Sequence, residues 1–179
     1  GVSRRPGSYK KHLGLTQIGL LHPELFCEVI ADDYHVPPEL FDFIYRCKGY
    51  QKICLISDGL SASGMPPGKY YLGKQGSGVP VIVDEHVALL SDRSAFSGSI
   101  TSIGTMVGRL ISRHTVLPQE AVYMASAAPA KLLGLEHKGN IAPGFDAELN
   151  ILDSRGTLKT TIISENFIYH HNEDAKNEI

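Results

Sequence analysis

Two polar side chains follow apolar runs that are typical of buried strands. His35 closes the polar cluster after residues 26–31, and Asp58 comes directly after residues 52–57. Parallel α/β folds carry reactive residues at the C-terminal ends of their strands, because the loops that follow face a common mouth. An aspartate there can take up and return a proton, and a histidine can hold a polar substrate. The pattern alone equally allows a turn-capping aspartate and a loop histidine without any chemistry.

A third segment of interest is Phe-Ser-Gly-Ser at residues 96–99. Small side chains let the backbone approach a ligand, and residues 100–111 carry apolar side chains at helical spacing. Ser99 is therefore expected to cap that helix, whose free N–H groups would suit an anion such as phosphate. A plain serine cap without a ligand is the more common meaning of such a pattern.

The elements that would position these residues follow one another as strand, helix and strand. Pro37 and Pro38 open a helical pattern that Gly49 closes, and this pattern lies between the two apolar runs. The order predicts a parallel βαβ unit. Helices are then expected from Ser99, from Pro118 to about residue 128 and from Pro129 to Gly134, and strands at residues 147–152 and 160–169.

Composition points to a small molecule as the partner. The 179 residues include 17 basic and 19 acidic side chains, a net charge of −2 without long runs of either sign. Neither nucleic acid nor a membrane is therefore expected as a partner, and the apolar runs are far too short to cross a bilayer. The three cysteines have no CxxC spacing and are expected to be buried free thiols in a reducing cytoplasm.

Four segments of the chain resemble the sequence motifs of one family of enzymes. Residues 29–38 (VIADDYHVPP) resemble the family's IADGxHxxP strand end, and residues 55–64 (LISDGLSASG) resemble its LVTDAxxAxG strand. Residues 96–101 (FSGSIT) resemble the LAGSxLT segment. Residues 138–149 (KGNIAPGFDAEL) resemble the KGxIAPGxDADL stretch found widely among amidohydrolases. The four segments occur in the family's order over almost the whole chain. By these segments the chain resembles the N-acetylglucosamine-6-phosphate deacetylases of the amidohydrolase superfamily.

The resemblance implies an α/β fold, the C-terminal portion of a (β/α)8 metal-dependent hydrolase barrel plus part of a small β-sandwich domain. Residues 1–64 would hold the last two barrel strands and their connecting helix, and residues 65–96 a β insertion. Residues 97–137 would form the closing helices, residues 138–170 the β-sandwich strands and residues 171–179 a tail. Since only two of eight barrel strands are present, the chain is expected to be part of a longer enzyme.

The resemblance also implies roles for single residues. Asp58 matches the family's catalytic acid/base, and His35 matches a histidine that contacts the substrate. Phe96, Ser97 and Gly98 match the segment whose backbone touches the substrate.

A basic loop would help to hold the phosphate of the sugar. The family's loop can be aligned here in two ways, which leaves both Arg4 and Lys11 as candidates. The chain departs from the family pattern at Asp33 and Gly59, where the family usually has Gly and Ala. Both departures lie beside a residue with an implied role, so they bear on fine substrate preference more than on the reaction.

The implied activity is hydrolysis of N-acetylglucosamine 6-phosphate to glucosamine 6-phosphate and acetate, in amino-sugar catabolism. A divalent metal, zinc or of the iron/manganese type, would activate the water. Its ligands are expected upstream of residue 1, with none in this chain, although Asp58 would approach the metal. The full-length enzyme is expected to be a cytoplasmic homodimer. Two alternatives stay open: a deacetylase for N-acetylgalactosamine 6-phosphate, and a catalytically incompetent fragment or partner subunit.

Overall fold

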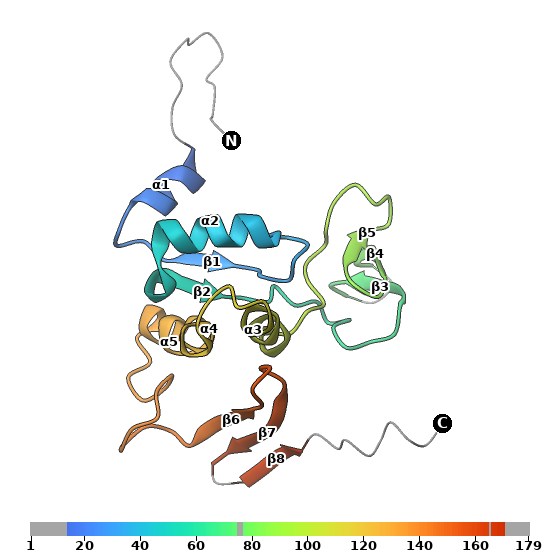
Figure 1. Ribbon diagram of the computed structural model, residues 1–179. Coiled ribbons are helices and arrows are strands. Elements are labelled where there is room, and N and C mark those ends of the chain that lie inside the picture. Colours follow the sequence, from blue (N-terminus) through green and yellow to red (C-terminus); the bar gives the residue numbers. More distant parts are fainter. Residues whose placement is uncertain (1–13, 75–76, 165, 171–179) are drawn as a thin grey trace, which may run out of the picture.

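The computed structural model describes residues 14–74, 77–164 and 166–170, and Figure 1 shows their arrangement. The strands form three separate sheets, and the helices gather around the first of them. The first described element is the helix α1 (Leu15–Leu21), which packs against the next helix along the chain. In the described ranges, no helix is both long and apolar enough to span a membrane.

The first sheet is the parallel pair that the sequence predicts. The strand β1 (Cys27–Val29) lies beside β2 (Ile53–Leu55), with Val29 opposite Leu55. The helix α2 (Pro38–Lys48) and the 3-10 turn η1 (Tyr50–Lys52) connect them, and Gly49 ends α2 at a φ of 69°. Both strands are shorter than their apolar runs, although the N–H of Ile56, just after β2, still donates to the carbonyl of Val29 at 3.0 Å. The predicted βαβ unit is confirmed.

The core lies where helices cover this pair of strands. In Figure 1, β1 and β2 lie between α2 on one side and α3 (Ile103–Ser112), α4 (Pro118–Ala125) and α5 (Ala127–Leu133) on the other. Its fully buried side chains come from β2 and from three helices: Phe41, Ile53, Leu55, Met106 and Met124. Burying such side chains stabilises each by about 1.5–3 kcal/mol relative to exposure, so this core holds the ends of β1 and β2 in place.

Three helix boundaries differ from the prediction. The helix α3 begins at Ile103 with Ser102 as its N-cap, whose hydroxyl accepts the N–H of Thr105 at 3.1 Å. The prediction that Ser99 caps this helix is wrong. The helix α4 ends at Ala125, because Ser126 leaves the helical conformation, and α5 starts two residues before Pro129. Gly134 ends α5 in the left-handed conformation, as predicted.

The second sheet lies within residues 65–96, the predicted β insertion. The strands β3 (Gly68–Leu72), β4 (Val79–Val83) and β5 (Ala88–Leu90) pair antiparallel in that order. Their own small core includes Leu60 and Ala62, from the segment after β2. The edge of β5 also binds the segment that follows it, since the N–H of Ser97 donates to the carbonyl of Ala88 at 2.9 Å. The insertion thereby positions residues 96–98.

The third sheet contains β6 (Glu148–Leu152), β7 (Leu158–Ile163) and β8 (Asn166–His170), paired antiparallel. The single strand predicted at residues 160–169 is wrong, because the chain reverses between β7 and β8. The turn before β7 packs on α3, where a Cβ added to Gly156 would lie 2.7 Å from the Cα of Gly108. The division of the chain into domains stays a prediction.

The cysteines are all free, but they are not all buried. Cys54 is buried in β2, Cys27 is half-buried and Cys47 is exposed on α2. Burial raises the pKa of the Cys54 thiol, and the nearby Glu28 and Cys27 act in the same direction. The expectation of three buried thiols is therefore wrong for Cys47, whose position on the outer face of an amphipathic helix leaves it in solvent.

Candidate functional site

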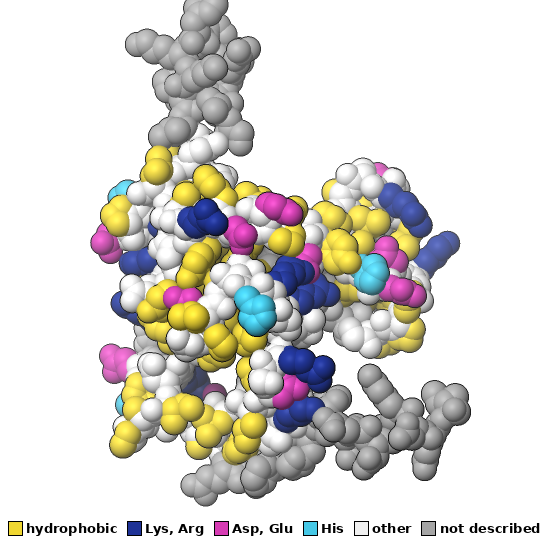
Figure 2. All heavy atoms as spheres, viewed as in Figure 1, with side chains coloured by type: hydrophobic (Ala, Val, Ile, Leu, Met, Phe, Trp, Pro, Cys, Tyr) yellow, Lys and Arg dark blue, Asp and Glu magenta, His cyan; other side chains and the backbone are white. Residues whose placement is uncertain are grey.

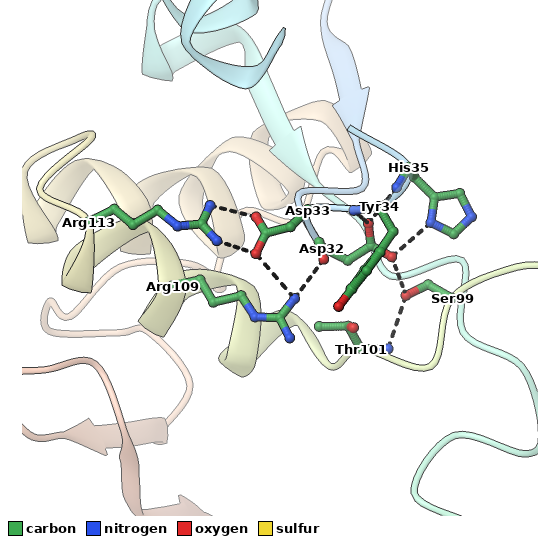
Figure 3. Close-up of polar contacts among 8 residues, drawn as sticks. All are labelled: Asp32, Asp33, Tyr34, His35, Ser99, Thr101, Arg109 and Arg113. Atoms are coloured by element: carbon green, nitrogen blue, oxygen red, sulfur yellow. Dashed lines mark hydrogen bonds and ion pairs between the residues drawn. The ribbon is translucent and has the colours of Figure 1, made fainter. Parts of the chain in front are cut away.

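A buried carboxylate lies at the centre of the candidate site. Asp32, in the turn after β1, is only 1% exposed. Its Oδ1 accepts the backbone N–H groups of Tyr34 at 3.0 Å and His35 at 2.8 Å. Its Oδ2 lies 2.8 Å from Nδ1 of His35 and accepts the hydroxyl of Ser99 at 3.1 Å (Figure 3). Both oxygens are thus bonded, which a buried charge requires.

The charge on Asp32 is stabilised by these bonds. Burial acts to raise the pKa of its carboxyl group, but the bonds from His35 and the N–H of Tyr34 together outweigh burial. The pKa of Asp32 therefore lies below its usual value. Because an ionised carboxylate only accepts hydrogen bonds, Nδ1 of His35 must carry a proton. The imidazole then has its other nitrogen, Nε2, for a substrate.

The histidine is also fixed from the side. The ring of Phe96 lies 4.6 Å from the ring of His35, centroid to centroid, at a tilt of 41°. Such aromatic contacts stabilise an orientation by about 0.5–1.5 kcal/mol. The neighbouring Tyr34 stacks on His86 of the β insertion at 5.8 Å. The loop after β1 and the β insertion therefore share two ring contacts.

Asp33, the residue after Asp32, faces helix α3. The carboxylate of Asp33 forms a two-pronged ion pair with Arg113, in which Nη1 donates to Oδ1 at 2.5 Å and Nη2 to Oδ2. Arg109, one helical turn earlier, donates from Nη1 to the carbonyl of Asp32 at 2.6 Å and lies 3.5 Å from Oδ2 of Asp33 (Figure 3). Figure 2 shows basic side chains gathered near the centre of the face of the molecule that it draws.

The ion pair affects the charge of Arg113. Its hydrogen bond with Asp33 raises the pKa of Arg113 above its usual value, against the opposing effect of burial. The carboxylates of Glu39 and Asp42 on α2 act in the same direction as Asp33. Arg113 is thus held as a cation among three carboxylates.

Ser99 joins the ends of the two parallel strands. Its hydroxyl binds Asp32 after β1, while its N–H donates to the carbonyl of Asp58 after β2 at 2.9 Å. Its carbonyl accepts the N–H of Leu60 at 3.1 Å, and Gly59 and Ser99 form a parallel bridge. Ser99 is thus an extended residue that continues the sheet beside β2. For that reason it cannot cap α3, which begins at Ile103.

The side chain of Asp58 is exposed and has a special backbone conformation. Its φ is 48°, in the left-handed region that non-glycine residues seldom adopt. Among the described residues, nothing forms a hydrogen bond or ion pair with its carboxylate. The strand β2 and the bond from Ser99 hold the Asp58 backbone, so its carboxylate is positioned without being neutralised by a partner.

Residues 96–98 pass beside Asp58. A Cβ added to Gly98 would lie 2.8 Å from the carbonyl oxygen of Asp58, and Gly98 has a φ of 102°, so only glycine fits. The hydroxyl of Ser97 is buried and has no partner within the described part of the chain. Phe96 is exposed beside His35. One glycine, one uncommitted hydroxyl and one aromatic ring therefore lie next to the two candidate residues.

Comparison with known proteins decides the family. The model of the Amidohydrolase family matches residues 12–175, nearly the entire chain. The chain belongs to the amidohydrolase family. It is 31% identical over 165 residues to N-acetylglucosamine-6-phosphate deacetylase of Vibrio furnissii, covering 91% of this chain and 40% of that protein. It is 32% identical over 151 residues to a putative N-acetylgalactosamine-6-phosphate deacetylase of Escherichia coli K12, covering 83% and 86%.

A solved structure shows the same fold. An aspartate-to-alanine mutant of N-acetyl-D-glucosamine-6-phosphate deacetylase from Mycobacterium smegmatis, in complex with N-acetyl-D-glucosamine-6-phosphate, matches with a TM-score of 0.78 at 27% identity. The match covers 91% of this chain and 42% of that one. This amidohydrolase therefore has the α/β fold of the C-terminal portion of a (β/α)8 hydrolase barrel, and it spans well under half of those two deacetylases.

The described residues of this amidohydrolase do not fit a metal by themselves. They contain no group of three His, Cys, Asp or Glu side chains that could hold an ion. Asp58 offers one free carboxylate, which can be at most one ligand of a complete set. Arg4 and Lys11, the candidates for phosphate binding, lie outside the described residues.

Three residues of this site were not predicted from the sequence: Asp32, Arg109 and Arg113. Asp32 had a local signal, because an aspartate three residues before a histidine in a turn can bond the backbone and ring of that histidine. Arg109 and Arg113 are four residues apart, a spacing that places them on one face of a helix. This spacing does not indicate their partner Asp33, which lies 76 and 80 residues earlier in the chain.

Proposed function

We propose that this chain is the C-terminal part of a deacetylase that hydrolyses the N-acetyl group of N-acetylglucosamine 6-phosphate. One observation carries the proposal: Ser99 bonds both strand ends, which places the uncommitted carboxylate of Asp58 and the oriented imidazole of His35 at the same edge of the sheet. The similarity to named deacetylases supports the same substrate class. The products would be glucosamine 6-phosphate and acetate.

Asp58 would act as general base and then as general acid. As a base, its carboxylate accepts a proton from water as the water oxygen attacks the acetyl carbonyl carbon. As an acid, it returns that proton to the amine nitrogen when the carbon–nitrogen bond breaks. The lack of any partner for this carboxylate among the described residues suits both steps, since no ion pair competes for the proton.

The divalent metal implied by the family resemblance, zinc or of the iron/manganese type, would need ligands from outside the described residues. We include it as part of the proposal for the whole enzyme. Asp58 is the one residue of the candidate site whose free carboxylate could approach such an ion.

His35 would hold the substrate through Nε2. The bond from Nδ1 to Asp32 and the contact with Phe96 fix the ring, so Nε2 accepts a hydrogen bond when the imidazole is neutral and donates one when it is protonated. The backbone of Phe96, Ser97 and Gly98 would contact the sugar or its phosphate, and Gly98 lets this segment pass close to Asp58. Because α3 begins at Ile103, the phosphate would bind residues 96–98 and the basic loop with Arg4 and Lys11, not the end of that helix.

Two alternatives have their own support. The similarity to a putative N-acetylgalactosamine-6-phosphate deacetylase, most of whose length this chain covers, supports the other epimer of the sugar. The lack of a metal-binding group among the described residues supports a catalytically incompetent fragment or a partner subunit. For the complete enzyme we further propose a homodimer in the cytoplasm.

The deciding experiment is an assay of acetate release. The chain is tested with Zn²⁺, Fe²⁺ or Mn²⁺, alone and after co-expression with the part of the Vibrio furnissii deacetylase that this chain does not match. Turnover of N-acetylglucosamine 6-phosphate by the co-expressed pair is the expected result. Faster turnover of the galactosamine epimer would favour the first alternative. Stable assembly without turnover of either sugar would favour the second.

A further inference from the structure

The turn that carries His35 is held from outside by two arginines. Arg109 bonds the carbonyl of Asp32, and Arg113 forms the two-pronged ion pair with the next residue, Asp33. The side chains of Asp33, Arg109 and Arg113 are 22%, 31% and 35% exposed. An ion pair with two parallel bonds at partial burial fixes geometry better than a fully exposed pair.

The backbone of Asp33 needs such support. Its φ is 74°, in the left-handed region where glycine has no steric penalty. Glycine is the residue that the resembled deacetylases usually have at this position. Aspartate tolerates the conformation better than most residues, but it gains no preference for it. In this chain, something besides the residue's own preference must therefore hold the turn.

We propose that Asp33 is a positioning residue, whose ion pair with Arg113 holds the left-handed turn that orients His35 against Asp32. The ion pair stabilises a backbone conformation that a glycine would adopt without steric penalty. The use of His35 for substrate binding rests on the proposed function, whereas its orientation by Asp33 does not.

The contacts inside the turn explain how the effect reaches His35. The left-handed Asp33 brings the N–H groups of Tyr34 and His35 back onto Oδ1 of Asp32. The same closure brings Nδ1 of His35 to 2.8 Å from Oδ2 of Asp32. If Asp33 leaves this conformation, all three bonds lengthen together. The proton on Nδ1 then loses its acceptor, and the ring shifts toward the tautomer with its proton on Nε2.

The test measures the tautomer ratio of His35 by ¹⁵N NMR of the 179-residue chain, at a pH where the ring is neutral and without substrate. The variants are Arg113→Gln, Asp33→Gly and the double variant, with Arg155→Gln as the matched control in the turn before β7. We expect Arg113→Gln to lower the ratio of Nδ1–H to Nε2–H roughly three- to tenfold. Asp33→Gly and the control should stay within about twofold of wild type, because the added freedom of glycine suits the turn.

The double variant decides the mechanism. Glycine at position 33 makes the ion pair unnecessary, so Arg113→Gln combined with Asp33→Gly should restore the ratio to near the wild-type value. An unchanged ratio in Arg113→Gln overturns the proposal, because the pair would then be an ordinary surface contact. A double variant as low as Arg113→Gln alone also overturns it, because Arg113 would then act through Glu39 or Asp42 on α2.

A urea unfolding curve for each variant shows that the measured chain is folded. If Arg113→Gln does not fold, Arg113→Lys takes its place, since lysine keeps the charge but cannot form both bonds. An intermediate ratio is then expected, and a wild-type ratio overturns the proposal. A failed deacetylation assay would leave this result untouched, because no step of the test uses the reaction.

Discussion

The hydroxyl of Ser99 donates a hydrogen bond of 3.1 Å to the buried carboxylate of Asp32, 67 residues earlier in the chain. The same hydroxyl accepts the N–H of Thr101 at 3.0 Å. Through its backbone, Ser99 also bonds the segment after β2, at Asp58 and Leu60. A single small residue, through its hydroxyl and its backbone, thus links the ends of both parallel strands to the segment that leads into α3.

Ser99→Ala tests this link through stability. Removing the hydroxyl leaves Asp32 and the N–H of Thr101 each without one buried partner, and a bond to a charged group contributes about 1.5–3 kcal/mol. We expect the free energy of unfolding in urea to fall by about that amount. Ser112→Ala is the control, because Ser112 is exposed and, among the described residues, its hydroxyl bonds only the carbonyl of Arg155. Equal losses for both variants would contradict the central role of Ser99.

Asp58→Asn tests the proposed acid/base. Asparagine tolerates the left-handed φ of 48° as well as aspartate does, so the fold and the binding of the sugar phosphate should stay largely intact. Turnover by the complete enzyme should fall about 10²- to 10⁴-fold, since the amide can neither take nor return a proton. The measurement is kcat for acetate release, beside the thermal midpoint. A kcat within tenfold of the wild-type value would remove Asp58 from the mechanism.

His35→Ala separates substrate placement from metal binding. The variant lacks the ring that Asp32 and Phe96 orient, so kcat/KM for N-acetylglucosamine 6-phosphate should fall in the complete enzyme. Metal content, measured by elemental analysis of the purified enzyme, should stay the same. Phe96→Leu serves as the milder comparison, because it removes only the ring contact. Loss of the metal in His35→Ala would identify His35 as a ligand instead.

The β1–β2 pair and its connecting helix could be predicted, because the signals are local. Apolar runs indicate the strands, and Pro38 and Gly49 mark the two ends of α2. The start of α3 could not be predicted in the same way. Ser99 has the composition of a cap, but a carboxylate 67 residues away takes its hydroxyl, and pairing with Gly59 holds it extended.

Asp58 and His35 could be singled out from their places after two apolar runs, and their roles stay predictions. The residues that hold the turn of His35 could not be found as easily. Arg109 and Arg113 show an ordinary helical spacing, and nothing near them in the sequence identifies the turn at Asp32 and Asp33 as their partner. Long-range ion pairs leave no periodic pattern in a sequence, which is why this part of the site appears only in the structure.

The low pKa of Asp32 predicts a dependence of stability on pH. Its folded-state pKa lies below the unfolded value, so the folded state binds fewer protons. Ionised Asp32 therefore stabilises the fold above the unfolded pKa, and this stabilisation is lost as the pH falls through the folded pKa. In urea titrations from pH 6 downward, the free energy of unfolding should fall more steeply for wild type than for Asp32→Asn. Parallel curves would show that Asp32 is not the linked group.

In the chain on its own, both faces of β2 are buried, with Ile53, Cys54 and Leu55 at most 1% exposed. The helices of the chain therefore cover this strand without further barrel strands.

Two other features favour association of the isolated chain. Within the described residues, β1 pairs with β2 alone, so its other edge has free backbone groups, and Leu15 and Leu21 of α1 are 84% and 68% exposed. The purified chain should therefore elute above 19.5 kDa in size-exclusion chromatography with light scattering, and Leu15→Lys should shift it toward the monomer. It should also release no acetate with added divalent metal, because the described residues hold no metal-binding group. A monomeric chain with sustained turnover would show that it forms a complete metal site without the matching part of a relative.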